Sequence, residues 1–170
     1  VGLKVAQNFQ SFVPADVNGS FGHPWACKRK CARFAAGHCA FGDRCGYCHL
    51  THTGGSTLDK RQRSMMSALT EAQQVDLLKW SLQERASTQG AFFQQVVDEF
   101  ITVVEQHFRL AGDWSSGHHH QAWRSMEKAL RKLDFSAPLC MLVSKSQYSP
   151  ELLAAEERLR GQLHLLDEEL

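Results

Sequence analysis

Residues 31–49 read CARFAAGHCAFGDRCGYCH, and this stretch decides how the N-terminal part of the chain folds. It offers four metal-binding side chains with seven, five and three residues between successive ones: Cys31, Cys39, Cys45 and His49. A structural zinc site takes four Cys or His ligands in a tetrahedron, and short loops return the chain to the same ion. The spacing therefore predicts one Zn²⁺ ion held by these four side chains.

The distribution of the cysteines favours metal binding over disulfides. Five of the six lie within 22 residues, from Cys27 to Cys48, interleaved with histidines, and Cys140 stands alone. A secreted disulfide scaffold would spread an even set over the whole fold. The segment 21–52 is also too short and too rich in glycine to hold a hydrophobic core without a metal. Thiolates kept for zinc indicate a reducing intracellular compartment, which the sequence does not specify further.

Aromatic residues accompany the four ligands. Phe34 follows the first cysteine by three, Phe41 precedes a glycine shortly after the second, and Tyr47 lies between the last cysteine and the histidine. This combination resembles the CCCH zinc-finger family, whose pattern is C-x7-C-x5-C-x3-H. The longer strings at 22–28 and 58–63 are similar to predicted CCCH proteins of dinoflagellates and related alveolate protists.

The resemblance implies binding of single-stranded RNA, because CCCH fingers typically stack aromatic rings on unpaired bases. Phe41 and Tyr47 occupy the positions of the family's stacking aromatics. Unpaired bases expose their faces to such rings, and basic side chains add attraction to phosphate. The basic candidates are Arg33, Arg44, Lys28, Arg29 and Lys30.

Positive charge, like the cysteines, is concentrated in the N-terminal part of the chain. Residues 1–63 carry nine Lys or Arg against three Asp, a formal charge of +6, whereas the remaining residues sum to −5. An N-terminal part of this charge is suited to meeting anions. We therefore expect an extended arm over 1–20, a CCCH zinc finger over 21–52, a linker over 53–57 and an all-α domain over 58–170.

The all-α domain is expected to be bundle-like, with four or five helices. Thr70 and Gln73 form a capping-box pattern, and Pro150 follows Ser149 as at the first turn of a helix. Apolar residues recur at helical spacing in four stretches, 75–82, 93–108, 123–133 and 152–170. The last stripe, of Leu152, Leu159, Leu163, Leu166 and Leu170, is suited to a partner helix. The run 138–143 is too short to assign, and no apolar run has the length of a membrane span.

Four further side chains leave an alternative open. His23 and Cys27 have three residues between them, as do Cys48 and His52, so the two pairs are mirror images in spacing. A second zinc site is one interpretation. The sequence alone favours the other, in which Cys27 and Cys48 are free thiols.

The function expected from these observations is zinc-dependent RNA binding by the finger. The alternative is a structural subunit of a large ribonucleoprotein or organellar complex, in which the finger and the amphipathic helices dock proteins. An enzyme is not expected. Four protein ligands leave a zinc ion no open position for activating water, and no catalytic triad or paired-carboxylate pattern stands out.

Overall fold

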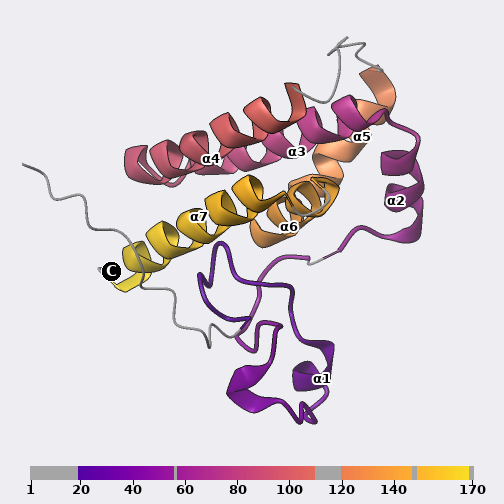
Figure 1. Cartoon of the computed structure of the whole chain (residues 1–170). Coiled ribbons are helices and arrows are strands. Elements are labelled where there is room, and N and C mark those ends of the chain that lie inside the picture. Colours follow the sequence, from indigo (N-terminus) through magenta and orange to yellow (C-terminus); the bar gives the residue numbers. More distant parts are fainter. Residues whose placement is uncertain (1–18, 56, 110–119, 147–148, 169–170) are drawn as a thin grey trace, which may run out of the picture.

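The computed structural model describes residues 19–55, 57–109, 120–146 and 149–168, and the chain within these ranges has two parts (Figure 1). The first is the Cys/His segment, residues 19–55, which contains the short helix α1 (Ala32–Ala35) and the 3-10 turn η1 (Gly42–Arg44). The second is a helical bundle. Its helices are α2 (Lys60–Ser67), α3 (Glu71–Ala86), α4 (Ala91–Arg109), α5 (His120–Leu130), α6 (Ser136–Lys145) and α7 (Pro150–Glu168). The expected arm over 1–20 lies almost wholly outside the described residues.

Capping residues set where several helices begin. Thr70 accepts a hydrogen bond from the backbone N–H of Gln73, whose side chain accepts one from the backbone N–H of Thr70, so the predicted capping box is confirmed. Asp59 and Gln62 form a second capping box at the start of α2. These reciprocal bonds satisfy backbone N–H groups that have no partner within the helix. Helix α7 begins at Pro150, as predicted from the Ser-Pro pair.

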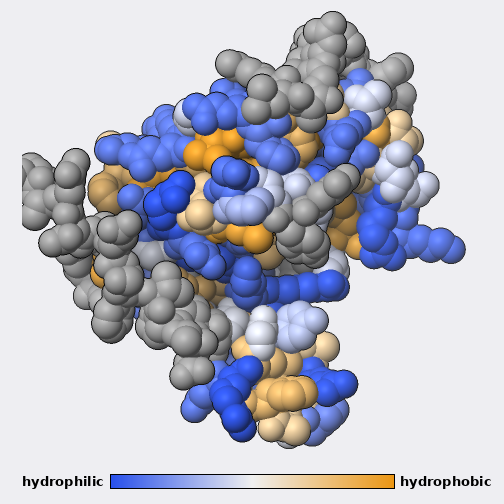
Figure 2. Space-filling view, in the orientation of Figure 1, coloured by the Kyte–Doolittle hydropathy of each residue, from blue (hydrophilic) through white to orange (hydrophobic). Residues whose placement is uncertain are grey.

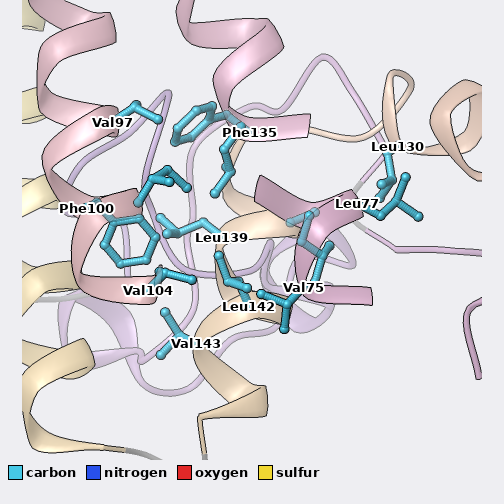
Figure 3. Close-up of a cluster of buried hydrophobic side chains, with 14 of the residues drawn as sticks. Val75, Leu77, Val97, Phe100, Val104, Leu130, Phe135, Leu139, Leu142 and Val143 are labelled. Carbon is cyan, nitrogen blue, oxygen red and sulfur yellow. The ribbon is translucent and has the colours of Figure 1, made fainter. Parts of the chain in front are cut away.

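The bundle core is built from apolar side chains of α3, α4, α5, α6 and α7. Figure 3 shows part of it, including Val75 of α3, Phe100 of α4 and Leu130 of α5. Helix α4 packs along α7, and α3 packs against both α6 and α4. Leu78, Val97 and Leu139 are fully buried where these helices meet. Within the described residues no helix is long and apolar enough to cross a membrane.

Two expectations about the helices need correction. Six described helices, rather than four or five, follow residue 57, and α6 covers the run 138–143 that the sequence left unassigned. The leucine stripe of α7 does not face outward for a partner helix. Leu152, Leu159 and Leu163 are buried within the chain, Leu166 packs against the core, and Leu170 lies outside the described residues.

The Cys/His segment is docked on the bundle. The ring of Trp25 meets Phe93 of α4 edge-on, with centroids 5.2 Å apart, and Ala26 belongs to the bundle core. The expected linker, 53–57, also makes defined contacts. The N–H of Gly55 donates to the carbonyl of Lys132 at 2.9 Å, and the N–H of Asp134 donates to the carbonyl of Gly55 at 2.8 Å. Two backbone hydrogen bonds therefore join the end of the Cys/His segment to the turn after α5.

Candidate metal centres

The first cluster consists of Cys31, Cys39, Cys45 and His49, the four ligands expected from their spacing. One ligand atom of each lies within 4.8 Å of the others. Local structure positions them: Cys31 is the N-cap residue of α1, and η1 leads directly into Cys45. The backbone N–H of Phe34 donates to Sγ of Cys31 at 3.4 Å and lowers the pKa of this thiol to about 7. The chain therefore folds around four convergent ligand atoms.

Two observations show that the first cluster fits a zinc ion. Ligand sulfurs in a zinc tetrahedron lie about 3.8 Å apart, given Zn–S bonds of about 2.3 Å, and Sγ of Cys45 lies 3.8 Å from Sγ of Cys31. In addition, Nε2 of His49 is buried without a hydrogen-bond partner. A buried nitrogen of this kind is costly unless it meets a proton donor or a metal. The ring of Phe34 stacks on the imidazole of His49, with ring centroids 4.2 Å apart, and this contact helps to orient the imidazole.

Phe41 and Tyr47 are both exposed, at 58% and 54% of their surface. Figure 2 shows apolar surface at the lower tip of the molecule, where Figure 1 places α1, with hydrophilic groups at its border. Neither ring is therefore needed to fill the interior of the Cys/His segment. Phe34 is half exposed as well, although one face of its ring covers His49.

The basic candidates are exposed, but they do not all have the same surroundings. Arg29, Lys30, Arg33 and Arg44 lie on the surface of the Cys/His segment. Lys28 differs, since its Nζ lies 3.3 Å from Oε1 of Glu156 on α7. This ammonium group therefore contributes to docking on the bundle, a contact that the sequence could not show.

The second cluster consists of His23, Cys27, Cys48 and His52. The sequence favours free thiols for its two cysteines, whereas the structure brings one ligand atom from each residue within 4.8 Å of the others. Sγ of Cys27 lies 3.7 Å from Nε2 of His52, and Sγ of Cys48 lies 3.5 Å from Nδ1 of His23. The structure thus contains two Cys/His groups of the kind that holds zinc, and none of the six cysteines, all of them described, is in a disulfide.

The two clusters are interleaved along the chain. Cys48 of the second cluster is followed directly by His49 of the first, and an isolated bridge pairs Lys30 with Cys48. The second cluster is the more deeply placed, with Cys27 fully buried and Cys48 1% exposed. Burial and the neighbouring Cys48 raise the pKa of the Cys27 thiol to about 12. The surroundings of the two clusters therefore differ, although their ligands share the same short segment.

No family model matches this chain, and no curated protein or solved structure is significantly similar to it. The inferences that follow therefore depend on the residues and geometry of the two clusters.

Proposed function

We propose that this chain is a zinc-dependent RNA-binding protein whose Cys/His segment contacts single-stranded RNA. The observation that carries the proposal is the exposure of Phe41 and Tyr47 beside the first cluster. Exposed aromatic rings on one small segment offer flat faces, and unpaired bases present their own flat faces to such rings. The CCCH-like spacing of ligands and aromatics around these rings supports the same assignment.

The position of each ring in the segment supports stacking on bases. Phe41 immediately precedes η1, and Tyr47 lies between Cys45 of the first cluster and Cys48 of the second. A metal-bound loop holds its backbone in place without regular secondary structure, so little conformational entropy is lost when a base binds. The two rings would therefore act as preformed platforms.

Basic residues supply the second component of binding. Arg29, Lys30, Arg33 and Arg44 are exposed on the same segment as the rings. Two stacked bases contribute roughly 2–6 kcal/mol before the costs of association are subtracted. Binding by the rings alone is therefore weak, and attraction between the arginine and lysine side chains and phosphate is needed for useful affinity.

The test uses the full chain with Phe41→Ala and Tyr47→Ala, titrated with fluorescent single-stranded RNA. Each variant should lose about 1–3 kcal/mol of binding free energy while keeping its zinc. Phe92→Ala is the matched control, because Phe92 is 51% exposed but belongs to α4. Equal binding by all three variants and the parent chain would contradict the proposal.

A second candidate function is protein docking within a large complex. The specific observation in its favour is Leu50, which is exposed near Tyr47 in sequence and offers apolar surface without a ring to stack on a base. If the parent chain fails to bind single-stranded RNA at low salt, while Phe41→Ala, Tyr47→Ala and Leu50→Ala release a co-purifying protein, docking replaces RNA binding as the function.

A further inference from the structure

We propose that the second cluster binds its own Zn²⁺ ion, and that this ion and Asp134 together fasten the Cys/His segment to the helical bundle. The ligands are Cys27, Cys48, His23 and His52. This proposal is independent of RNA binding, because it concerns how the segment is held and not what its surface contacts.

The interatomic distances in the second cluster match a zinc tetrahedron. With Zn–S bonds of about 2.3 Å and Zn–N bonds of about 2.0–2.1 Å, a sulfur and a nitrogen ligand lie about 3.5 Å apart. The two measured pairs are 3.7 Å for Cys27 Sγ to His52 Nε2 and 3.5 Å for Cys48 Sγ to His23 Nδ1. Both distances therefore suit two ligands of one ion.

The charge of the ligand set suits its buried position. Two thiolates and two neutral imidazoles cancel the charge of Zn²⁺, so the complex is neutral overall. Cys27 and Cys48 are almost completely buried, and a net charge at this depth would be costly.

Asp134 supplies the contact that orients one ligand. Nδ1 of His52 donates to Oδ2 of Asp134 at 2.9 Å, which directs Nε2 of the same ring toward Cys27. Metal-binding histidines commonly donate their second N–H to a carboxylate, and this bond fixes the tautomer and the orientation of the ring. The side chain of His52 is almost fully buried, so the arrangement is shielded from water.

Asp134 also connects the cluster to the bundle. It follows α5, and its Oδ1 accepts a hydrogen bond from the N–H of Gly54 at 2.7 Å. One carboxylate therefore holds both a ligand of the second cluster and the backbone just after it. Occupation of the site would therefore help to hold the end of the Cys/His segment against the turn after α5.

The alternative explanation of the same geometry is an ion pair between protonated His52 and Asp134, with thiols as hydrogen-bond partners and no metal. Native mass spectrometry of the full chain, purified with zinc under reducing conditions, distinguishes the two. Two zinc ions per chain are expected. A parent chain that binds one zinc ion, or that has a disulfide between Cys27 and Cys48 under these conditions, would overturn the proposal.

Single substitutions assign each ion to its cluster. Cys27→Ser should lose the second ion and keep the first, and Cys39→Ser should do the reverse. Cys140→Ser is the matched control, because Cys140 lies outside both clusters and should leave two ions in place. Retention of two ions by Cys27→Ser would contradict the assignment.

Asp134→Asn tests the positioning role without removing a ligand. Asparagine keeps an oxygen for the N–H of Gly54 but cannot accept from Nδ1 of His52 with its amide nitrogen. The zinc affinity of the second cluster should fall about 10–100-fold in chelator competition, with that of the first cluster unchanged. An unchanged affinity of both clusters would remove Asp134 from the proposal, and an equal fall at both would show general destabilisation of the segment instead.

Discussion

Oδ2 of Asp134 accepts a hydrogen bond from Nδ1 of His52 at 2.9 Å, although 82 positions of sequence separate the two residues. The backbone of Gly54 and Gly55 bonds to the same turn after α5. Elsewhere on the segment, Trp25 packs on Phe93 and Lys28 pairs with Glu156. The Cys/His segment is thus attached at several points along its length and does not hang from a free linker.

Removal of zinc should unfold the Cys/His segment while the bundle helices persist. A short segment such as residues 27–52 is expected to need a metal for its structure. The buried leucines of α3, α6 and α7, by contrast, form a core of their own. Hydrogen exchange with and without a strong chelator should show loss of protection confined to the segment. Unfolding of the whole chain on chelation, or a first-cluster ion that survives Cys39→Ser combined with Cys45→Ser, would contradict this expectation.

The salt dependence of RNA binding should distinguish Arg29 and Lys30 from Lys28. Replacing Arg29 and Lys30 by Gln removes two exposed charges. For single strands, each phosphate that is no longer neutralised reduces the slope of log K against log salt concentration (the salt slope) by about 0.7. Lys28→Gln should reduce the slope by less, because its ammonium already pairs with Glu156. All RNA sequences should be affected alike.

The control for this experiment is Arg124→Gln, which removes an exposed charge from α5. Titrations at several salt concentrations give the slopes. An equal reduction for Arg124→Gln would mean that overall charge, rather than the basic residues of the Cys/His segment, governs binding.

Glu156→Ala should be among the more destabilising substitutions in the chain. Glu156 and Arg160 are both buried, and the Nε of Arg160 donates to Oε1 of Glu156 at 3.0 Å. Removal of the carboxylate leaves a buried guanidinium without its partner, which typically costs about 3–5 kcal/mol of stability. Lys28→Ala removes a half-exposed partner of the same carboxylate and should cost at most about 1 kcal/mol.

Denaturant unfolding monitored by helical circular dichroism measures both changes. Similar unfolding midpoints for Glu156→Ala and the parent chain would show that Arg160 finds another partner. A large loss with Lys28→Ala would instead assign most of the stabilisation to the contact between the Cys/His segment and α7.

Gly19→Ala should disturb the Cys/His segment. The backbone of Gly19 crosses that of Tyr47 so closely that a Cβ atom would lie 2.3–2.5 Å from Tyr47 backbone atoms. Gly19 also donates to the carbonyl of Cys45 at 2.8 Å, so the crossing cannot open without breaking this bond. A destabilisation of about 1–3 kcal/mol is expected.

Gly46→Ala is the matched control, because a Cβ there would meet nothing within 4 Å. Chelator competition reports on the stability of the segment in both variants. Equal zinc retention by Gly19→Ala and Gly46→Ala would show that the crossing of residues 19 and 47 is not rigid.

Local patterns in the sequence predict the first cluster and most of the helices. The spacing from Cys31 to His49 brings four ligands together over short loops, and the capping box at Thr70 fixes the start of α3. Both signals act between residues that are close in sequence. They therefore need no knowledge of how the parts of the chain pack.

Helix α6 was not predicted from the sequence, for two physical reasons. Its buried residues include Leu139, Leu142 and Val143 around much of its circumference, so it lacks the polar face that gives a periodic pattern. Pro138 also resembles a helix breaker, yet it stands in the first turn, where backbone N–H groups have no partner within the helix.

The second cluster depends on contacts between distant residues. His23 and Cys27 meet Cys48 and His52 only because the chain folds back around the first cluster, and His52 is oriented by Asp134 from the bundle. Spacing alone is equally compatible with free thiols. In the same way, the leucine stripe of α7 resembles a partner surface until α4 is seen to cover it.

The late position of Asp134 in the sequence also bears on how the chain matures during translation. The first cluster has all its ligands once His49 has been made, whereas Asp134 is added 82 residues after His52. At about 5–20 residues per second, this interval lasts roughly 4–16 s. A nascent chain thus has time to capture an ion in the first cluster before the ribosome supplies the carboxylate that orients His52.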